Sequence, residues 1–260
     1  MKNPLMMIPW LGLQDPVASL THFAAAAGVL GGSFHLLRKG RGNGLRVAAL
    51  VVFCASLLFL FCMSGIYHGL PPGPSRAFFR RLDYAGIWIV IAGSATPVHL
   101  LLLRGLWRWG LTAVFWTAAL TCLFLMDNYL SLLPYWAILL GYAGVSMLGA
   151  ISISRIVGRY GWKETSLLLC GGAAYAGGAV MDALDGPVLW KGIIGPHELF
   201  HVLVIVGALL HWVFIYKRAD RRLPSPRAAW ATLRYAFSSY RRPKAAIWNR
   251  GLAAPPVEPA

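Results

Sequence analysis

The chain has 260 residues, of which 58% are hydrophobic and only 13% are charged. A soluble domain carries nearly twice that share of charged residues, so the composition excludes an ordinary water-soluble protein and indicates helices in lipid. The formal net charge is +15, but the basic residues gather at the ends of apolar runs and near the C-terminus. This pattern indicates contact with anionic lipid headgroups and argues against nucleic acid as a partner.

Seven apolar runs are long enough to cross the hydrocarbon core of a bilayer as helices. In chain order they cover residues 17–37, 47–70, 83–103, 109–126, 135–154, 166–183 and 197–216. The short segments between them contain glycine, proline or charged residues. We therefore predict an all-α, polytopic seven-transmembrane-helix bundle over residues 17–216. An N-terminal segment (1–16) precedes it, and a basic tail (217–260) follows, for which an interfacial helix and a disordered segment are both open.

Lysine and arginine are distributed unevenly between the two ends of this predicted bundle. Nine of them lie in the first, third and fifth connections and ten lie in the tail. The opposite side carries five, which are Lys2, Arg76, Arg80, Arg81 and Lys191. Cytoplasmic loops of membrane proteins hold the excess of these residues. We therefore predict a multi-pass protein of the plasma (inner) membrane with its tail in the cytoplasm.

Several ionisable residues lie inside the predicted spans, where such residues are rare and usually face the bundle interior. The second span ends with Ser64 and His68, and the third begins with Asp83. The seventh begins with His197 and His201, which are spaced so that they stack on one face of a helix. Because successive spans alternate in direction, all five side chains are expected at one face of the membrane.

Three imidazoles leave one of four tetrahedral positions open, which is the ligand count of a catalytic zinc site. We therefore predict a Zn2+ site with His68, His197 and His201 as ligands. Asp83 is the predicted catalytic base, and Ser64 is predicted to hold a substrate oxygen or to hydrogen-bond near the metal. Three histidines suit several metals, so the residues do not select zinc. The alternative is a packed pair of interhelical histidines without a metal.

Other polar residues near this face have different interpretations. His211 lies about 15 Å deeper than His201 by helix rise, so an interhelical hydrogen bond is expected for it. His22 begins the first span at the same face, and both a structural role and a role at the metal are open. Residues 197–201 also match HExxH, in which the glutamate, here Glu198, is the general base of zinc proteases. The protease alternative leaves His68 of the second span and Asp83 of the third span without a role. If the protein is not a protease, Glu198 is expected to pair with a neighbouring helix.

Four strings carry a resemblance to a known family: residues 64–68 (SGIYH), 82–83 (LD), 91–97 (IAGSATP) and 195–201 (GPHELFH). At these residues the chain resembles the hemolysin III family, the bacterial branch of the progestin and adiponectin receptor (PAQR) superfamily. Residues 19–22 are similar to the first-span motif of the family, although Ala18 stands where an asparagine is common. Gln14 and Asp15 are the candidates for an acidic residue that the family has upstream. The resemblance covers about residues 14–216.

The resemblance implies zinc held by His68, His197 and His201, with a water molecule bridging to Asp83. Eukaryotic relatives and the related alkaline ceramidases imply hydrolysis of lipid amides. We therefore predict a zinc-dependent membrane hydrolase, with membrane lipids as partners, a lipid amide as substrate and a role in membrane lipid homeostasis. A non-enzymatic zinc-stabilised sensor or receptor and a cytolytic protein remain as alternatives. In the adiponectin receptors the zinc face is cytoplasmic, opposite to the orientation that the charges predict here.

Overall fold

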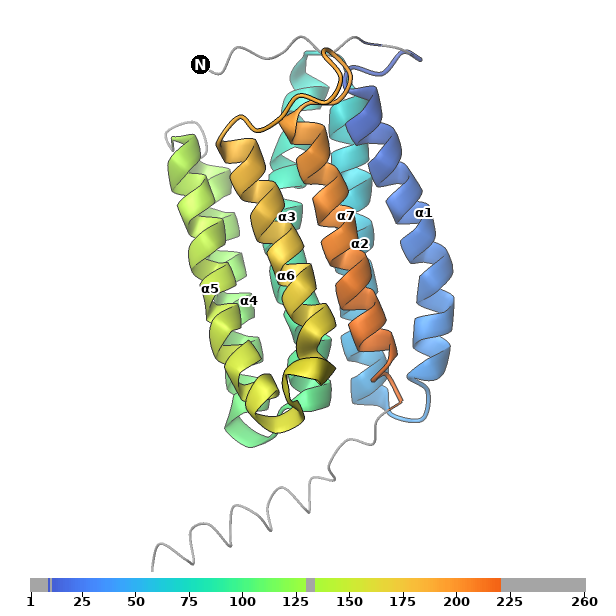
Figure 1. Cartoon of the computed structure of the whole chain (residues 1–260), viewed down its shortest axis with the longest axis vertical. Helices are drawn as coiled ribbons and strands as arrows, with labels where there is room; N and C mark the ends of the chain where they lie inside the picture. Colours follow the sequence, from blue (N-terminus) through green and yellow to red (C-terminus); the bar gives the residue numbers. More distant parts are fainter. Residues whose placement is uncertain (1–8, 10, 130–133, 221–260) are drawn as a thin grey trace, which may run out of the picture. The chain divides into compact units, whose positions relative to one another are not determined.

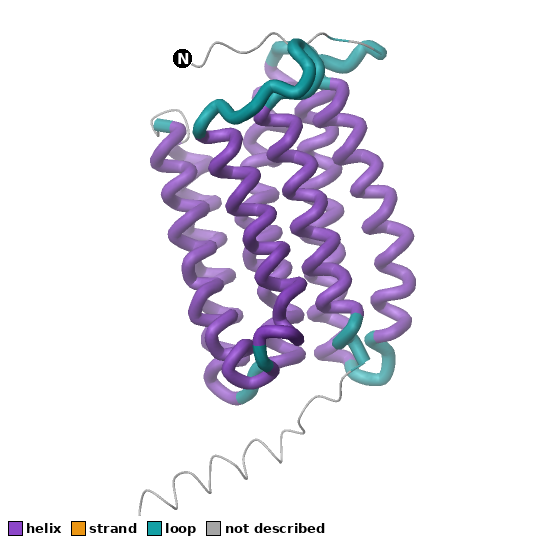
Figure 2. The backbone as a smooth tube through the Cα atoms, viewed as in Figure 1, coloured by secondary structure: helices purple, strands orange, loops and turns teal. Residues whose placement is uncertain are grey.

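The computed structural model describes residues 9, 11–129 and 134–220, and these residues form seven helices that run up and down (Figure 1). The helices are α1 (Pro16–Lys39), α2 (Gly44–Gly69), α3 (Pro74–Leu102), α4 (Gly105–Tyr129), α5 (Tyr135–Tyr160), α6 (Trp162–Ala183) and α7 (Pro196–Tyr216). No strand is drawn anywhere in the described part of the chain (Figure 2). Each helix is long and apolar enough to cross a membrane. The predicted all-α, seven-helix fold is therefore confirmed.

Several helices extend beyond the apolar runs that predicted them. α3 begins at Pro74, well before the expected start at Asp83, because Pro in the first turn of a helix loses no hydrogen bond. The segment expected to be a polar break therefore forms the first turns of α3. In the same way α4 begins at Gly105 and α5 continues to Tyr160. Hydropathy marks the part of a helix that lies in hydrocarbon, whereas the helices continue past it.

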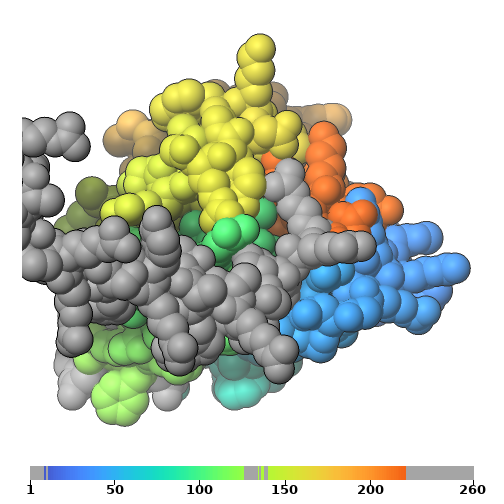
Figure 3. Space-filling view, turned by 90° about the horizontal axis from the view of Figure 1, so that it is seen from below, coloured from blue at the N-terminus to red at the C-terminus, as the bar shows by residue number. Residues whose placement is uncertain are grey.

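The polar residues of interest meet because helix ends alternate along the chain. α2 ends, and α3 and α7 begin, at the upper end of the bundle in Figure 1, which we call the histidine end. α7 finishes at the opposite end, called the tail end, where the α1–α2 turn and the α5–α6 junction come to the surface (Figure 3). The predicted C-terminal tail covers residues 217–260, and its residues from 221 onward lie outside the described part of the chain.

Small residues bring α2 and α3 into close contact. A Cβ atom on Gly86 would lie 2.9 Å from a methyl carbon of Leu60, and one on Gly93 would overlap the side chain of Ser56. Close approach of this kind through small residues is the usual means of packing helices in lipid. It holds the end of α2 beside the start of α3, and α3 is the most buried of the seven helices.

The close packing of α6 on α7 also depends on glycines. A Cβ atom on Gly171 would lie 3.1 Å from the carbonyl oxygen of Gly207, and one on Gly207 would lie 3.0 Å from that of Gly171. α7 packs extensively on α6 and much less on α1 and α3. The histidines of α7 therefore approach α2 from a helix pair that packs mostly within itself.

Candidate metal centre

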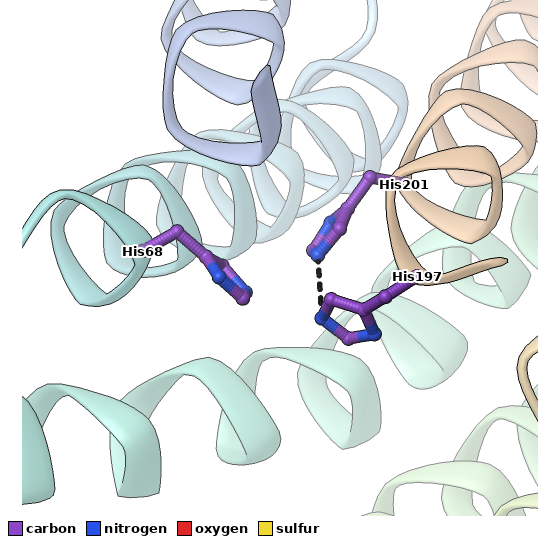
Figure 4. A group of neighbouring side chains, drawn as sticks. All are labelled: His68, His197 and His201. Atoms are coloured by element: carbon purple, nitrogen blue, oxygen red, sulfur yellow. Dashed lines mark hydrogen bonds between the residues drawn. The ribbon is translucent and has the colours of Figure 1, made fainter. Parts of the chain in front are cut away.

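Three histidine side chains from two helices converge at the histidine end. His68 lies in the last turn of α2, and His197 and His201 lie in the first two turns of α7. One ring nitrogen from each lies within 4.8 Å of the other two, and the three rings point toward one another (Figure 4). The Nε2 atoms of His197 and His201 are 3.1 Å apart. Two nitrogens bound to one tetrahedral zinc stand roughly 3.3 Å apart, so this spacing fits an ion.

The other ring nitrogen, Nδ1, of each histidine is held by an outer partner. Metal-binding histidines in proteins almost always have such a partner, which sets the tautomer and the ring orientation. The pairs are His68 with Asp15 Oδ2 at 3.0 Å, His197 with Asp182 Oδ1 at 3.2 Å, and His201 with His22 Nε2 at 2.9 Å. All three Nε2 atoms are thereby left for the common centre.

The burial of His68 supplies a separate indication that this centre fits an ion. The residue is only 3% exposed, and its Nε2 atom has no hydrogen-bond partner among the described residues. A buried polar atom without a partner carries a desolvation penalty of about 1–3 kcal/mol. A cation placed between the three rings would satisfy this nitrogen. The donor set of three neutral imidazoles suits zinc and several other transition metals.

Asp15 lies just before α1 and joins the chain start to the ends of α2 and α3. Its backbone N–H donates to the His68 carbonyl over 2.8 Å, and its carboxylate accepts a 2.5 Å hydrogen bond from Arg76 Nη2. Burial raises the pKa of Asp15. The hydrogen bonds from His68 and Arg76 lower the pKa by more than burial raises it, so the pKa lies below its usual value. Of the two candidates for the acidic motif residue, Asp15 is the one that contacts a histidine, whereas Gln14 donates its backbone N–H to Gly69.

The two residues predicted to act in catalysis lie beside the histidines. Asp83 on α3 is 8% exposed and is close enough to interact electrostatically with His68 and His197. Its carboxylate does not belong to the group of atoms that lie within 4.8 Å of one another. Ser64, one turn before His68, is fully buried next to Asp83. Its Oγ interacts with the Asp83 carboxylate and has no other hydrogen-bond partner in the described part of the chain.

Two partners of the histidines were not assigned from the sequence. Asp182 was given no role, although its place in the last turn of α6 puts it at the same end of the bundle. His22, for which two roles were open, contacts His201 and packs edge-on against Phe61, so it lies outside the three-nitrogen group. In the sequence, the position of His22 at the start of the first span was the feature that placed it near the other histidines.

Glu198 and His211 make their contacts away from the three-nitrogen group. The Glu198 carboxylate accepts a 2.9 Å hydrogen bond from the backbone N–H of Gly195 and so caps its own helix. This contact lies at the start of α7 itself, where N–H groups lack partners within the helix, and not on a neighbouring helix, where a partner was expected. His211 contacts the carbonyl oxygen of Leu168 on α6 through Nε2 at 3.1 Å, as expected for an interhelical hydrogen bond.

Comparison with known proteins relates nearly the whole helical region to one family. A family model described as Haemolysin-III related matches residues 13–212. Hemolysin-3 of Bacillus cereus is 27% identical over 173 residues, which are 65% of this chain and 74% of that protein. A Hemolysin-3 homolog of Bacillus subtilis (strain 168) is 23% identical over 171 residues, 64% and 75% of the two chains. Heptahelical transmembrane protein ADIPOR1 of Oryza sativa subsp. japonica is 30% identical over 196 residues, 67% of this chain and 52% of that protein.

Proposed function

The chain belongs to the haemolysin-III related family, within the PAQR superfamily, and we propose that it is a zinc-dependent membrane hydrolase of lipid amides. The observation that carries the proposal is the convergence of three histidine Nε2 atoms from α2 and α7, with the Asp83 carboxylate beside them. His68, His197 and His201 would hold the ion. Their outer partners and the unsatisfied Nε2 of His68 support this assignment.

The chemistry of amide hydrolysis gives each neighbouring side chain a step. A bound zinc ion would polarise the amide carbonyl and make a water molecule more acidic. Asp83 accepts a proton from water as the new C–O bond forms, and it returns the proton to the amide nitrogen as the C–N bond breaks. The products are a carboxylic acid and an amine. The Ser64 hydroxyl donates a hydrogen bond to the carbonyl oxygen as negative charge develops there.

A lipid substrate follows from where the site lies. His68 and His197 each lie one residue from a helix end, and His201 lies five residues from the start of α7, so the centre lies within roughly 8 Å of the helix ends. The headgroup region on each side of a bilayer is about 5–8 Å thick, so a centre within this distance of the helix ends can meet the linkage between headgroup and acyl chain. Membrane lipids are accordingly the proposed partners, and a lipid whose acyl chain is joined through an amide is the proposed substrate.

The test combines metal content with turnover in purified protein. We expect about one zinc ion per chain in the wild type and none in His68→Ala, measured by elemental analysis in detergent. Asp83→Ala should keep the ion, because Asp83 is not a ligand, and should lose hydrolysis of N-acyl sphingoid lipids. Retention of turnover by Asp83→Ala would remove Asp83 from the mechanism.

A non-enzymatic, zinc-stabilised sensor is the second candidate. It is favoured by the way the three histidines join α2 to α7, two helices with little other contact. That candidate predicts bound zinc without hydrolysis of any N-acyl lipid tested. The relatives named Hemolysin-3 suggest cytolysis as a third activity. Lysis of cells by the purified wild type, and its loss in His201→Ala, would support that activity.

For localisation we propose the plasma (inner) membrane, with the tail end of the bundle toward the cytoplasm. Among the described residues, eleven lysines and arginines lie at the tail end and four lie at the histidine end. Acidic side chains instead collect at the histidine end: Asp15, Asp83, Asp182, Asp185 and Glu198. A C-terminal fusion to green fluorescent protein should fluoresce in bacteria, and a fusion to alkaline phosphatase should be inactive. The reverse pair of results contradicts this orientation.

A further inference from the structure

Two aspartates contact the proposed metal ligands without belonging to the ligand group. Asp15 lies before α1 and Asp182 lies in the last turn of α6, so the two come from distant parts of the chain. Each carboxylate lies within hydrogen-bonding distance of the Nδ1 atom of one histidine, 3.0 Å for His68 and 3.2 Å for His197. The third histidine, His201, has the imidazole of His22 as its partner instead of a carboxylate.

We propose that Asp15 and Asp182 are positioning residues that hold His68 and His197 in the tautomer and ring orientation required for metal binding. A neutral imidazole carries one N–H group. When Nδ1 carries it and donates to a carboxylate, the lone pair of Nε2 is free for the ion. The negative charge behind the ring also makes Nε2 a stronger ligand.

The His68–Asp15 and His197–Asp182 pairs differ in burial, and this difference predicts which aspartate matters more for metal binding. The side chains of His68 and Asp15 are 3% and 15% exposed, whereas those of His197 and Asp182 are 46% and 16% exposed. A hydrogen bond in a less solvated place is electrostatically stronger. Asp15 is also held from a second side by Arg76. Loss of Asp15 therefore weakens metal binding more than loss of Asp182.

This inference rests on the proposed metal site, but it does not require that the protein hydrolyse anything. The test uses purified full-length protein stripped of metal, with zinc affinity measured by competition with a chromogenic chelator. Removal of an outer partner typically lowers metal affinity 10–100-fold. We expect a loss in that range for Asp15→Ala, a smaller one for Asp182→Ala, and an intermediate one for Asp15→Asn, which keeps an acceptor oxygen without the charge.

Asp220→Asn is the matched control, because it removes the same charge at the tail end, where Asp220 lies 3.9 Å from Lys39. Its zinc affinity should equal that of the wild type. The visible absorption of bound Co2+ adds a readout of ligand geometry, which should change in Asp15→Ala and stay unchanged in the control. If the alanine variants do not fold, Asp15→Asn and Asp182→Asn serve in their place.

The outcomes separate this inference from the proposed function. If the wild type binds neither Zn2+ nor Co2+, the metal site itself is wrong and the positioning role falls with it. If the wild type binds zinc and both aspartate variants bind it within about twofold of the wild type, the positioning role alone is overturned. A variant that unfolds more readily without metal, yet keeps wild-type affinity, also overturns it, because Asp15 is then a structural residue.

Discussion

Glu198 lies between two histidines in the sequence, yet its carboxylate turns to the backbone of Gly195. The first N–H groups of a helix have no partner within the helix, and an acidic side chain in the first turn also interacts favourably with the helix dipole. Glu198 is only 3% exposed. Its position therefore serves the start of α7, and the HExxH spacing is better explained by two stacked histidines with a capping residue beside them.

The capping role predicts that Glu198→Gln keeps activity and stability close to those of the wild type, because the amide oxygen still accepts from Gly195. Glu198→Ala should lower the free energy of unfolding by about 1 kcal/mol, as loss of a helix cap typically does. Thermal unfolding in detergent and hydrolysis assays measure the two effects. Complete loss of turnover in Glu198→Gln, with zinc retained, would instead favour the protease-like role for this glutamate.

At the scale of helices, the α6–α7 pair shows why neighbouring glycines are not equivalent. A Cβ atom on Gly171 would overlap the ring of His211, whereas one on Gly172 would meet no atom within 4 Å. Gly171 lies where α7 crosses closely, and Gly172 faces away from that crossing. The crossing in turn sets the rotation of α7, and with it the direction of His197 and His201.

Gly171→Ala and Gly172→Ala form a matched pair of variants. Gly171→Ala should destabilise the protein by about 1–3 kcal/mol, because the added methyl group forces the helices apart. Gly172→Ala should be neutral or stabilising by up to about 1 kcal/mol, since alanine restricts the unfolded chain more than glycine does. Thermal unfolding in one detergent gives both values. Equal effects of the two substitutions would contradict the packing described for α6 and α7.

For the whole molecule, the three histidines connect two groups of helices that pack mostly within themselves. α1, α2, α3 and α4 pack in chain order, and α6 packs on α7, whereas α7 packs much less on α1 and α3. His68 comes from the first group, and His197 and His201 come from the second (Figure 4). An ion held by all three stabilises the arrangement in which the two groups are together.

Metal removal should therefore lower the thermal stability of the wild type. A ligand that binds only the folded state at 100 times its Kd adds about 2.7 kcal/mol to the free energy of unfolding. A chelator should thus lower the unfolding temperature of the wild type and leave that of His201→Ala unchanged, since this variant lacks a ligand. Differential scanning fluorimetry measures both. An equal decrease in the two proteins would mean that the chelator acts elsewhere.

The amino-acid sequence was sufficient to predict the architecture, because few kinds of structure can span a bilayer. Long apolar runs must become helices when no water is present to satisfy the backbone, and this led to the seven-helix fold, which the structure confirms. Alternation of helix direction then predicted that His68, Asp83 and His201 share one end of the bundle. The metal-binding and catalytic roles of these residues remain predictions.

What required the tertiary structure was the direction in which individual side chains point. The contact of Asp15 with His68 and of Asp182 with His197 depends on how each helix is rotated and how the chain enters α1. Hydropathy reports how deep a residue lies along a helix and carries little information on rotation about the helix axis, which close packing at glycines decides.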